Sequence, residues 1–330
     1  MKITIIGDGA WGTALALNLL YNRHQVTLWG AFPEYLDEIR SKQENFKFLP
    51  GVKIPAELRL CGDMADAVSG ADLILLATPT QFLRGTLKKL LPVFRRETPV
   101  VNVAKGIEVE SWKRISQIIA DELGEVDFID LSGPSHAEEV SRRVPTAVVA
   151  AAESPASAEL VQKLMMNEFF RVYTSSDVVG VELGGALKNV MAIAAGILDG
   201  MKLGDNPKAA MMTRGISEMS KLGEALGGQR STFAGLSGIG DLIVTCTSGH
   251  SRNRHVGEEL GRGKAMEQIQ KEMGMVVAEG VPTARGAYTL ARQCQVETPI
   301  TDEIYNILYR QRDVRDAIRS LMMRKAKPEE

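Results

Sequence analysis

The residue best suited to acid–base chemistry in this sequence is Lys188, which lies in the run Glu182–Asn189 (ELGGALKN). The segment that follows, residues 192–196 (AIAAG), consists almost entirely of small residues, so neighbouring segments can pack closely around the lysine. Burial disfavours the charged ammonium and lowers the pKa of a lysine toward neutrality, which suits a general acid and base. A lysine that extends its amino group to water also fits this segment.

A second polar segment runs from Gly235 to Arg254. Asp241 follows a glycine-rich turn, a geometry that can hold a carboxylate close to another side chain. The run Ser251–Asn253 begins a predicted helix, where backbone N–H groups, the helix dipole and the Arg252 guanidinium together suit a phosphate. An N-capping serine beside a surface arginine accounts for the same residues without a ligand, and both interpretations can hold together.

Two ends of predicted strands carry further polar residues. Lys105 follows the apolar run Val100–Val103, and Ser135 lies in the turn Ser132–Ala137 (SGPSHA). Carboxyl ends of parallel strands are where doubly wound sheets bind ligands, so both residues are candidates for a substrate site. A solvated lysine and a helix-capping serine are the alternatives. His136 lies in the same turn, but a single histidine is weak evidence, and we assign it no catalytic role.

Three glycines near the N-terminus have the spacing of a dinucleotide-binding loop. Gly7, Gly9 and Gly12 form G-x-G-x-x-G directly after the apolar run Ile3–Ile6 and open a predicted helix. The early glycines permit a tight turn and a close approach of the backbone to a pyrophosphate, and the last lets the helix pack against the sheet. The loop therefore predicts binding of a nicotinamide dinucleotide.

The sequence leaves the choice between NAD and NADP open. NAD-preferring sites usually carry an acidic residue at the end of the second strand, about 20 residues further on, which binds the ribose hydroxyls. Here that strand ends in residues 29–32 (WGAF), which include no carboxylate, arginine or histidine. The missing acid favours NADPH, whereas the missing cation weakens that interpretation.

The elements that must position these residues change in character along the chain. Short apolar runs that alternate with helical segments predict an α/β domain, a Rossmann-like doubly wound and mainly parallel sheet. Long helical segments then predict an all-helical C-terminal domain, with the division placed at residues 1–180 and 181–330. The predicted strands are Ile3–Ile6, Val26–Trp29, Asp72–Ala77, Val100–Val103, Phe128–Leu131, Thr146–Ala150 and Arg171–Tyr173. The predicted helices are Trp11–Tyr21, Gln81–Leu91, Trp112–Leu123, Pro155–Asn167, Val178–Met201, Pro207–Leu226, Arg252–Gly261, Thr283–Cys294 and Thr301–Arg310.

Composition excludes several classes of protein. A net charge of -2 over 330 residues gives no field that would attract nucleic acid. The three cysteines are far apart, which argues against a disulfide framework, and the four histidines lack ligand spacing, so we expect no metal.

The sequence shows neither a targeting signal nor a membrane span. The chain enters its first strand without a signal peptide, and no apolar run reaches the ~20 residues of a membrane span. We therefore expect a soluble, cytoplasmic protein. The basic segment from Arg310 to Glu330 reads as a solvated amphipathic helix with a frayed tail, with a membrane-surface helix as the alternative.

Seven segments together resemble one family, the NAD(P)-dependent sn-glycerol-3-phosphate dehydrogenases of the bacterial type. They occur in the family's order and span residues 7 to 283. The segments are residues 7–17 (GDGAWGTALAL), 104–107 (AKGI), 133–140 (GPSHAEEV), 182–190 (ELGGALKNV), 235–247 (GLSGIGDLIVTCT), 251–254 (SRNR) and 277–283 (VAEGVPT).

The resemblance implies reversible reduction of dihydroxyacetone phosphate to sn-glycerol 3-phosphate with NAD(P)H, which supplies glycerophospholipid synthesis. It implies that Lys188 gives and takes the proton, and we expect Asp241 to orient that lysine. The substrate contacts implied are Lys105, Gly133, Ser135, Lys188, Asp241, Ser251, Arg252 and Asn253. The coenzyme contacts, including the glycine loop, are Gly7, Gly9, Trp11, Gly12, Lys105, Ala137, Arg252, Val277 and Glu279. A homodimer is also implied.

Two other functions fit part of the sequence. A β-hydroxyacid dehydrogenase of the phosphogluconate type shares the glycine-rich start and a lysine on the first helix of its second domain. Such enzymes usually place an asparagine one helical turn beyond the lysine, whereas Asn189 is adjacent to Lys188 here. A nucleotide-binding sensor without activity would be free to lose Lys188 or Asp241, and the sequence keeps both.

Overall fold

Eight strands form one sheet in the N-terminal half of the protein, in the order β3-β2-β1-β4-β5-β6-β7-β8. The computed structural model describes residues 1–274, 277–326 and 328–329. The strands are β1 (Lys2–Ile6), β2 (Gln25–Trp29), β3 (Arg59–Cys61), β4 (Leu73–Leu76), β5 (Val100–Asn102), β6 (Phe128–Ser132), β7 (Thr146–Ala152) and β8 (Phe170–Ser175). All neighbouring pairs are parallel except β6 with β7, which confirms the mainly parallel sheet.

Helices cover both faces of this sheet, which is why its strands are apolar along nearly their whole length. The helices α1 and α7 pack in one buried apolar cluster with β1, while α4 and α5 pack in another on the opposite face. The helices of this half are α1 (Ala10–Tyr21), α2 (Pro33–Lys42), α3 (Met64–Val68), α4 (Thr80–Leu90), α5 (Ile115–Leu123), α6 (Ala137–Val140) and α7 (Pro155–Met165).

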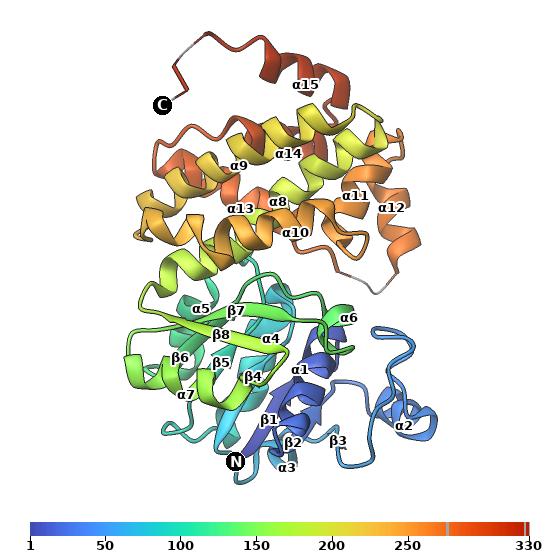
Figure 1. The fold of residues 1–330 in the computed structure, drawn as a ribbon, viewed down its shortest axis with the longest axis vertical. Coiled ribbons are helices and arrows are strands. Elements are labelled where there is room, and N and C mark those ends of the chain that lie inside the picture. The colour runs from blue at the N-terminus through green and yellow to red at the C-terminus, as the bar shows by residue number, and fades with distance from the viewer. Residues whose placement is uncertain (275–276, 327, 330) are drawn as a thin grey trace.

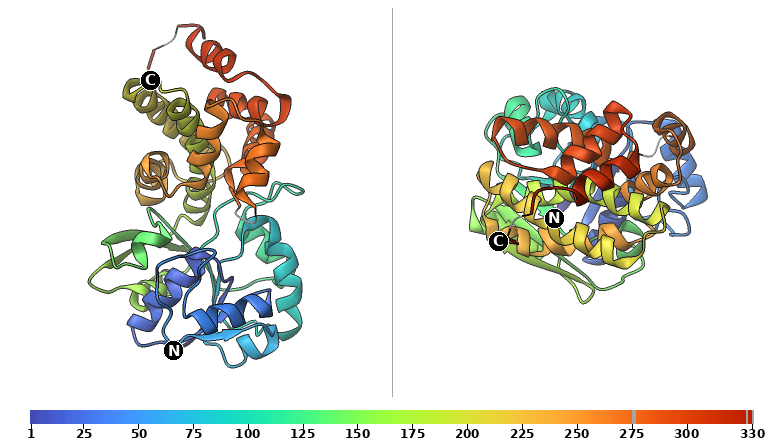
Figure 2. Two further views of the ribbon diagram at one scale, coloured as in Figure 1. Left: turned by 90° about the vertical axis from the view of Figure 1, so that its right-hand side faces the viewer. Right: turned by 90° about the horizontal axis from the view of Figure 1, so that it is seen from above.

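The C-terminal half is built around one long helix, α8 (Val178–Gly200) (Figure 1). Figure 2 shows this helical half stacked on the sheet half along the long axis of the molecule. The other helices here are α9 (Asp205–Ala225), α10 (Asp241–Thr247), α11 (Arg252–Gly261), α12 (Met266–Met273), α13 (Gly280–Gln293), α14 (Pro299–Arg310) and α15 (Val314–Met322). Since β8 ends at Ser175 and α8 begins at Val178, we propose a domain division close to residues 180 and 181.

Most predicted elements are confirmed to within a few residues, and the errors have local causes. The helix predicted from Trp112 begins only at Ile115, because Trp112 has a left-handed backbone with φ of +59° that a helix cannot continue. Strand β3 was not predicted since it has only three residues, of which Arg59 is exposed. Helices α2, α3, α6, α10, α12 and α15 are also additional to the prediction, although α15 lies in the basic segment expected to be helical.

Helix α8 is buried because small residues let its neighbours approach its backbone. A Cβ atom at Gly196 would lie 1.9 Å from the carbonyl oxygen of Arg254, and one at Gly257 would lie 2.0 Å from that of Ile193. Glycine is thus required on both helices where α8 and α11 cross. Length and composition alone would let α8 span a membrane, but 89% of its most apolar 18-residue window is buried within the protein. Helix α8 is therefore the core of this half.

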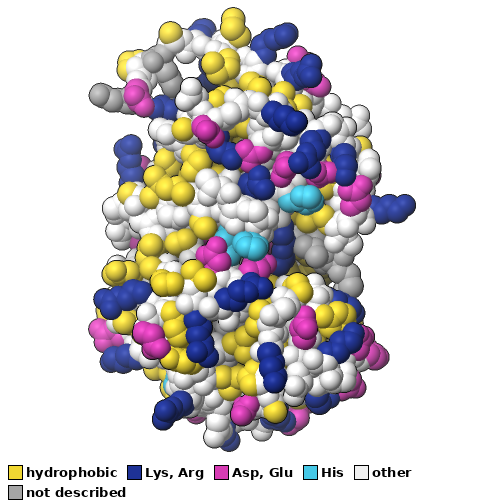
Figure 3. All heavy atoms as spheres, turned by 45° about the vertical axis from the view of Figure 1, so that its right-hand side comes forward, with side chains coloured by type: hydrophobic (Ala, Val, Ile, Leu, Met, Phe, Trp, Pro, Cys, Tyr) yellow, Lys and Arg dark blue, Asp and Glu magenta, His cyan; other side chains and the backbone are white. Residues whose placement is uncertain are grey.

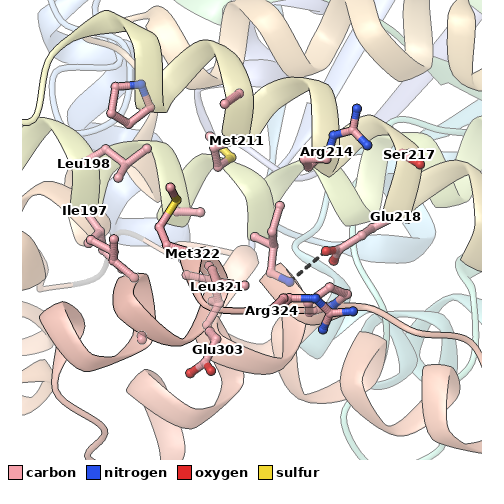
Figure 4. Close-up of a pocket in the computed structure, with 18 of the residues that line it drawn as sticks. Ile197, Leu198, Met211, Arg214, Ser217, Glu218, Glu303, Leu321, Met322 and Arg324 are labelled. Carbon is pink, nitrogen blue, oxygen red and sulfur yellow. Dashed lines mark hydrogen bonds between the residues drawn. The ribbon is translucent and has the colours of Figure 1, made fainter. Parts of the chain in front are cut away.

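A cavity of about 380 Å³ lies beneath the C-terminal helix, between α8, α9, α14 and α15. Figure 4 shows Ile197, Leu198 and Met211 on one side of it and Leu321 and Met322 on the other. Glu218 lies at this cavity and accepts hydrogen bonds from the backbone N–H groups of Ile300 and Thr301, at 2.7 and 3.2 Å. Its carboxylate thus caps the N-terminus of α14.

Candidate active site

Two lysines from different halves of the protein share one buried carboxylate. Lys188 Nζ on α8 donates a hydrogen bond to Asp241 Oδ1 at 2.7 Å, and Lys105 Nζ donates to Asp241 Oδ2, also at 2.7 Å. Lys105 follows β5 and also donates to the carbonyl oxygen of Gly133 at 2.9 Å, after β6. The side chains of Lys188 and Asp241 are 8% and 1% exposed, so this cluster is shielded from water.

This arrangement changes the acidity of both partners. Burial lowers the pKa of Lys188 to about 8, an effect strengthened by the charge of Lys105 and opposed by that of Asp241. Burial alone would raise the pKa of Asp241, but the ammonium groups of Lys105 and Lys188 outweigh it and lower that pKa. Lys188 can therefore exchange a proton near neutral pH while Asp241 stays charged.

The local sequence explains how Lys188 and Asp241 meet. A π-helical turn over Leu236–Gly240 leads into α10, which begins at Asp241. One turn later on α10, the Thr245 hydroxyl lies 2.6 Å from both Lys188 Nζ and the carbonyl oxygen of Asp241. Thr245 is a site residue that our sequence analysis missed, although its i,i+4 spacing from Asp241 places both on one helix face.

The segment proposed to bind phosphate opens α11 beside the lysine. The Ser251 hydroxyl caps this helix by accepting a hydrogen bond from the Arg254 N–H at 3.2 Å. Asn253 donates to Asn189 Oδ1 at 2.9 Å and accepts from the Gly280 N–H at 2.8 Å. These bonds tie the start of α11 to the residue next to Lys188. Asn189 is the second residue that sequence analysis did not assign.

Arg252 lines the cleft from the start of α11 and is exposed. Its Nη1 donates a hydrogen bond to the carbonyl oxygen of Val277 at 3.4 Å, and among the described residues it forms no ion pair. A helix N-terminus with an available guanidinium is a site for a phosphate dianion.

The glycine loop lies at the carboxyl ends of β1 and β4, where the order of strands reverses. Gly7 has φ of +126°, and a Cβ there would lie 2.7 Å from the backbone of Ala77. A Cβ at Gly12 would lie 2.0 Å from the carbonyl oxygen of Gly7, whereas one at Gly9 would meet no atom within 4 Å. Gly7 and Gly12 are thus required for packing, and Gly9 leaves open space at the start of α1. This geometry fits a dinucleotide pyrophosphate.

Glu279 closes the site from the helical half. Its Oε1 accepts a hydrogen bond from the backbone N–H of Thr80 at 2.8 Å, at the start of α4. Among the described residues, its Oε2 is buried without a hydrogen-bond partner, as is the Thr80 hydroxyl, and both face Gly106. Burial raises the pKa of Glu279 to about 7, opposed by the Thr80 N–H and by Arg252. Unsatisfied polar atoms at a cleft suit a polar ligand.

A cleft of about 240 Å³ joins these parts between the two halves of the protein. Figure 3 shows histidine and charged side chains gathered at the waist of the molecule. Of the residues predicted from sequence, the cleft is lined by Trp11, Lys105, Ser135, Ala137, Lys188, Ser251, Arg252, Asn253, Val277 and Glu279. Gly133 and Asp241 contact Lys105, which lines the cleft. Gly7, Gly9 and Gly12 are not lining residues, but Ala10 and Trp11 of the same loop are.

His136 lines the cleft, and burial and the charge of Lys188 lower the pKa of its imidazole. Among the described residues, its Nε2 is buried and has no hydrogen-bond partner. In the part of the chain that the structure describes, no three His, Cys, Asp or Glu side chains are grouped as metal ligands.

A glycine loop at the reversal point of a parallel sheet and a buried lysine between two domains define a two-domain dehydrogenase of the Rossmann type. More specifically, the chain belongs to the NAD-dependent glycerol-3-phosphate dehydrogenase family. The family's N-terminal model matches residues 2–158, and its C-terminal model matches residues 177–319. This membership excludes the phosphogluconate-type alternative.

Relatives of known function and solved structures match this chain over nearly its whole length. A glycerol-3-phosphate dehydrogenase [NAD(P)+] of Bacillus pumilus is 50% identical over 98% of this chain and 94% of its own. The crystal structure of glycerol-3-phosphate dehydrogenase from Coxiella burnetii is 35% identical, with a TM-score of 0.94 over 98% of this chain and 99% of that one. The Saccharomyces cerevisiae enzyme is 26% identical, with a TM-score of 0.81 over 96% and 98%.

Proposed function

We propose that this protein reversibly reduces dihydroxyacetone phosphate to sn-glycerol 3-phosphate with NAD(P)H. The observation that carries the proposal is the buried Lys188–Asp241–Lys105 cluster, which opens on a cleft between a dinucleotide loop and the start of α11. The names of the relatives give the substrate, and the geometry supports the chemistry.

The bound nicotinamide would supply a hydride to the ketone carbon of the substrate. Negative charge then develops on the ketone oxygen, and the Lys188 ammonium stabilises that charge and delivers a proton. Asp241 keeps Lys188 oriented, and Thr245 fixes it from a second direction. In the reverse direction, neutral Lys188 takes the proton from the substrate hydroxyl.

The substrate phosphate would bind at the start of α11. Arg252 provides a guanidinium there, and the first-turn N–H groups of the helix point toward the same anion. Because this phosphate does not react, its binding serves to hold the ketone against Lys188. Lys105, Gly133 and Ser135 lie on the sheet side of the cluster and would contact the substrate from there.

Three broader features belong to the same proposal. The product would supply glycerophospholipid synthesis, and the protein would act in the cytoplasm. It would also form a homodimer, which is consistent with the apolar side chains of Met322 and Met323 being 79% and 80% exposed at the end of α15. Light scattering on a size-exclusion column would test the dimer, and a monomer at all concentrations would contradict it.

The activity is tested by following absorbance of the reduced coenzyme with purified protein and dihydroxyacetone phosphate. We expect oxidation of NADH, NADPH or both, and reduction of the matching coenzyme with sn-glycerol 3-phosphate. Absence of turnover with both coenzymes, in a protein shown to be folded by circular dichroism, would overturn the proposal. D-Lactate and 6-phosphogluconate serve as control substrates and should give no turnover.

A further inference from the structure

An acidic side chain occupies the position at the end of β2 that the sequence of that strand leaves empty. Asp8 lies between Gly7 and Gly9 in the dinucleotide loop, yet its carboxylate extends to Gly30, the first residue after β2. A Cβ at Gly30 would lie only 2.5 Å from Asp8 Oδ2 and 2.8 Å from its Cγ. The carboxylate therefore fills the space where a side chain of residue 30 would begin.

One oxygen of this carboxylate, Oδ2, has no hydrogen-bond donor among the residues that the structure describes. Asp8 Oδ2 is buried, and burial raises the pKa of Asp8, opposed in part by a hydrogen bond from its own backbone. A buried carboxylate oxygen without a donor costs free energy, so its retention calls for a donor that arrives with a ligand.

The loop around Asp8 is held rigidly. The Asn45 side chain donates to the carbonyl oxygen of Asp8 at 2.7 Å and lies 2.8 Å from the Thr13 hydroxyl on α1. Tyr35 donates its hydroxyl hydrogen to Asn45 Oδ1 at 2.6 Å from the far side. Asp8 is thus fixed at the end of β2 before any nucleotide binds, which lowers the cost of ordering it.

Position decides which part of a nucleotide this carboxylate would meet. In sheets of this kind the pyrophosphate lies over the glycine loop, and the adenosine ribose lies over the end of the second strand. A carboxylate accepts hydrogen bonds but cannot donate them, so it can bind a ribose 2′-hydroxyl. The same carboxylate repels a 2′-phosphate, which carries negative charge and also accepts.

The two residues that follow Gly30 provide no cation to offset that repulsion. Ala31 and Phe32 follow Gly30 and are both exposed, and neither carries a charge. The ammonium of Lys42 lies 3.5 Å from the centre of the Phe46 ring, and that of Lys47 lies 4.2 Å from the centre of the Tyr35 ring. Both lysines are therefore engaged with aromatic rings.

We propose that Asp8, lying against Gly30, binds the adenosine ribose hydroxyls of the coenzyme and makes the protein prefer NAD(H) to NADP(H). This inference rests on the proposed dehydrogenase function and specifies its coenzyme. Glycine at position 30 is required for this coenzyme preference, since any side chain there would displace the Asp8 carboxylate.

Binding of each coenzyme without substrate tests the inference independently of turnover. Titration of NADH and NADPH, followed by quenching of tryptophan fluorescence, gives the ratio of the two Kd values. We expect the protein to bind NADH more tightly, and Asp8→Ala to lower that preference by about 10- to 100-fold, the range for a hydrogen bond to a charged group. Asp8→Asn keeps the shape of the side chain and should lower the preference as well, mainly by tighter NADPH binding.

Two further variants make the result specific to the placement of the carboxylate. Glu34→Gln removes a charge from the exposed first turn of α2 and should leave the ratio unchanged. The double variant Asp8→Gly with Gly30→Asp moves the acid to the residue that follows β2 and should restore the preference for NADH. Tighter binding of NADPH by the unaltered protein, or an unchanged ratio in both Asp8 variants, would overturn the inference. Failure to bind either coenzyme would instead contradict the proposed function.

Discussion

Lys188 and Lys105 are held by opposite oxygens of one buried carboxylate, that of Asp241. The two lysines are far apart in sequence and come from different halves of the protein. The carboxylate holds the two ammonium groups close together, and the charge of Asp241 raises the pKa of Lys188 while that of Lys105 lowers it. The first three predictions follow from this arrangement.

Replacing Lys188 should remove the proton donor without affecting the coenzyme loop. We expect Lys188→Ala to lower kcat by ~10²–10⁴, the usual contribution of a general acid. Steady-state assays measure kcat, and fluorescence titration of the coenzyme should give an unchanged Kd. Lys163→Ala changes an exposed lysine on α7 and is the matched control, with kcat expected to be normal. Near-normal kcat in Lys188→Ala would exclude Lys188 as the acid.

The direction of reaction should respond to pH through Lys188. Since its pKa is lowered to about 8, the ammonium needed for ketone reduction is lost as pH rises through 8. We expect reduction of dihydroxyacetone phosphate to decline above that pH and oxidation of sn-glycerol 3-phosphate to increase. Profiles of kcat against pH in both directions measure this effect. Two profiles that rise together would contradict it.

Replacing Asp241 and replacing Lys105 should shift that pH dependence in opposite directions. Asp241→Asn removes the charge that supports the ammonium, so the pKa of Lys188 falls and the decline begins at lower pH. Lys105→Met removes a repelling charge, so the pKa of Lys188 rises and the decline begins at higher pH. Both variants should also be slower. Shifts in the same direction for the two variants would show that charge does not set this pKa.

The crossing of α8 and α11 should tolerate no side chain at Gly196. We expect Gly196→Ala to destabilise the protein by about 1–3 kcal/mol, because its Cβ would overlap the backbone of α11. Gly85→Ala on α4 is the matched control, since a Cβ there meets no atom within 4 Å. This control should stabilise the helix by roughly 0.5–1 kcal/mol. Urea unfolding compares the two, and equal effects would argue against the close crossing.

Glu218 should make stability depend on pH near neutrality. Burial raises its pKa to about 7 in the folded protein, above the value of 4.5 for an unfolded chain. Its contribution to stability is therefore fully present below pH 4.5 and is lost as pH rises through 7, by an amount on the order of 3 kcal/mol. Thermal unfolding of Glu218→Gln should lack this component. The Tm difference between variant and unaltered protein should shift in favour of glutamine from pH 5 to pH 8.

Much of this fold could be predicted from sequence because its elements have local causes. Apolar runs that alternate with helical segments predicted seven of the eight strands and the mainly parallel sheet. The glycine spacing after β1 predicted the dinucleotide loop. Small residues around Lys188 allowed for its burial, although a lysine that reaches water fitted the segment equally well. Short elements such as β3 were missed, since three residues carry too little periodic pattern.

Only the tertiary structure decided which residues far apart in the chain are in contact. Sequence named Lys105, Lys188 and Asp241 separately, but only packing of the two halves places both lysines on one carboxylate. Asp8 is the clearest case. Residues 29–32, at the end of the second strand, include no acid, so the sequence alone left the choice between NAD and NADP open. The fold brings a carboxylate from the preceding loop to that same point. The local sequence determines the helices, strands and turns, whereas the folded backbone determines which side chains from distant segments lie in contact.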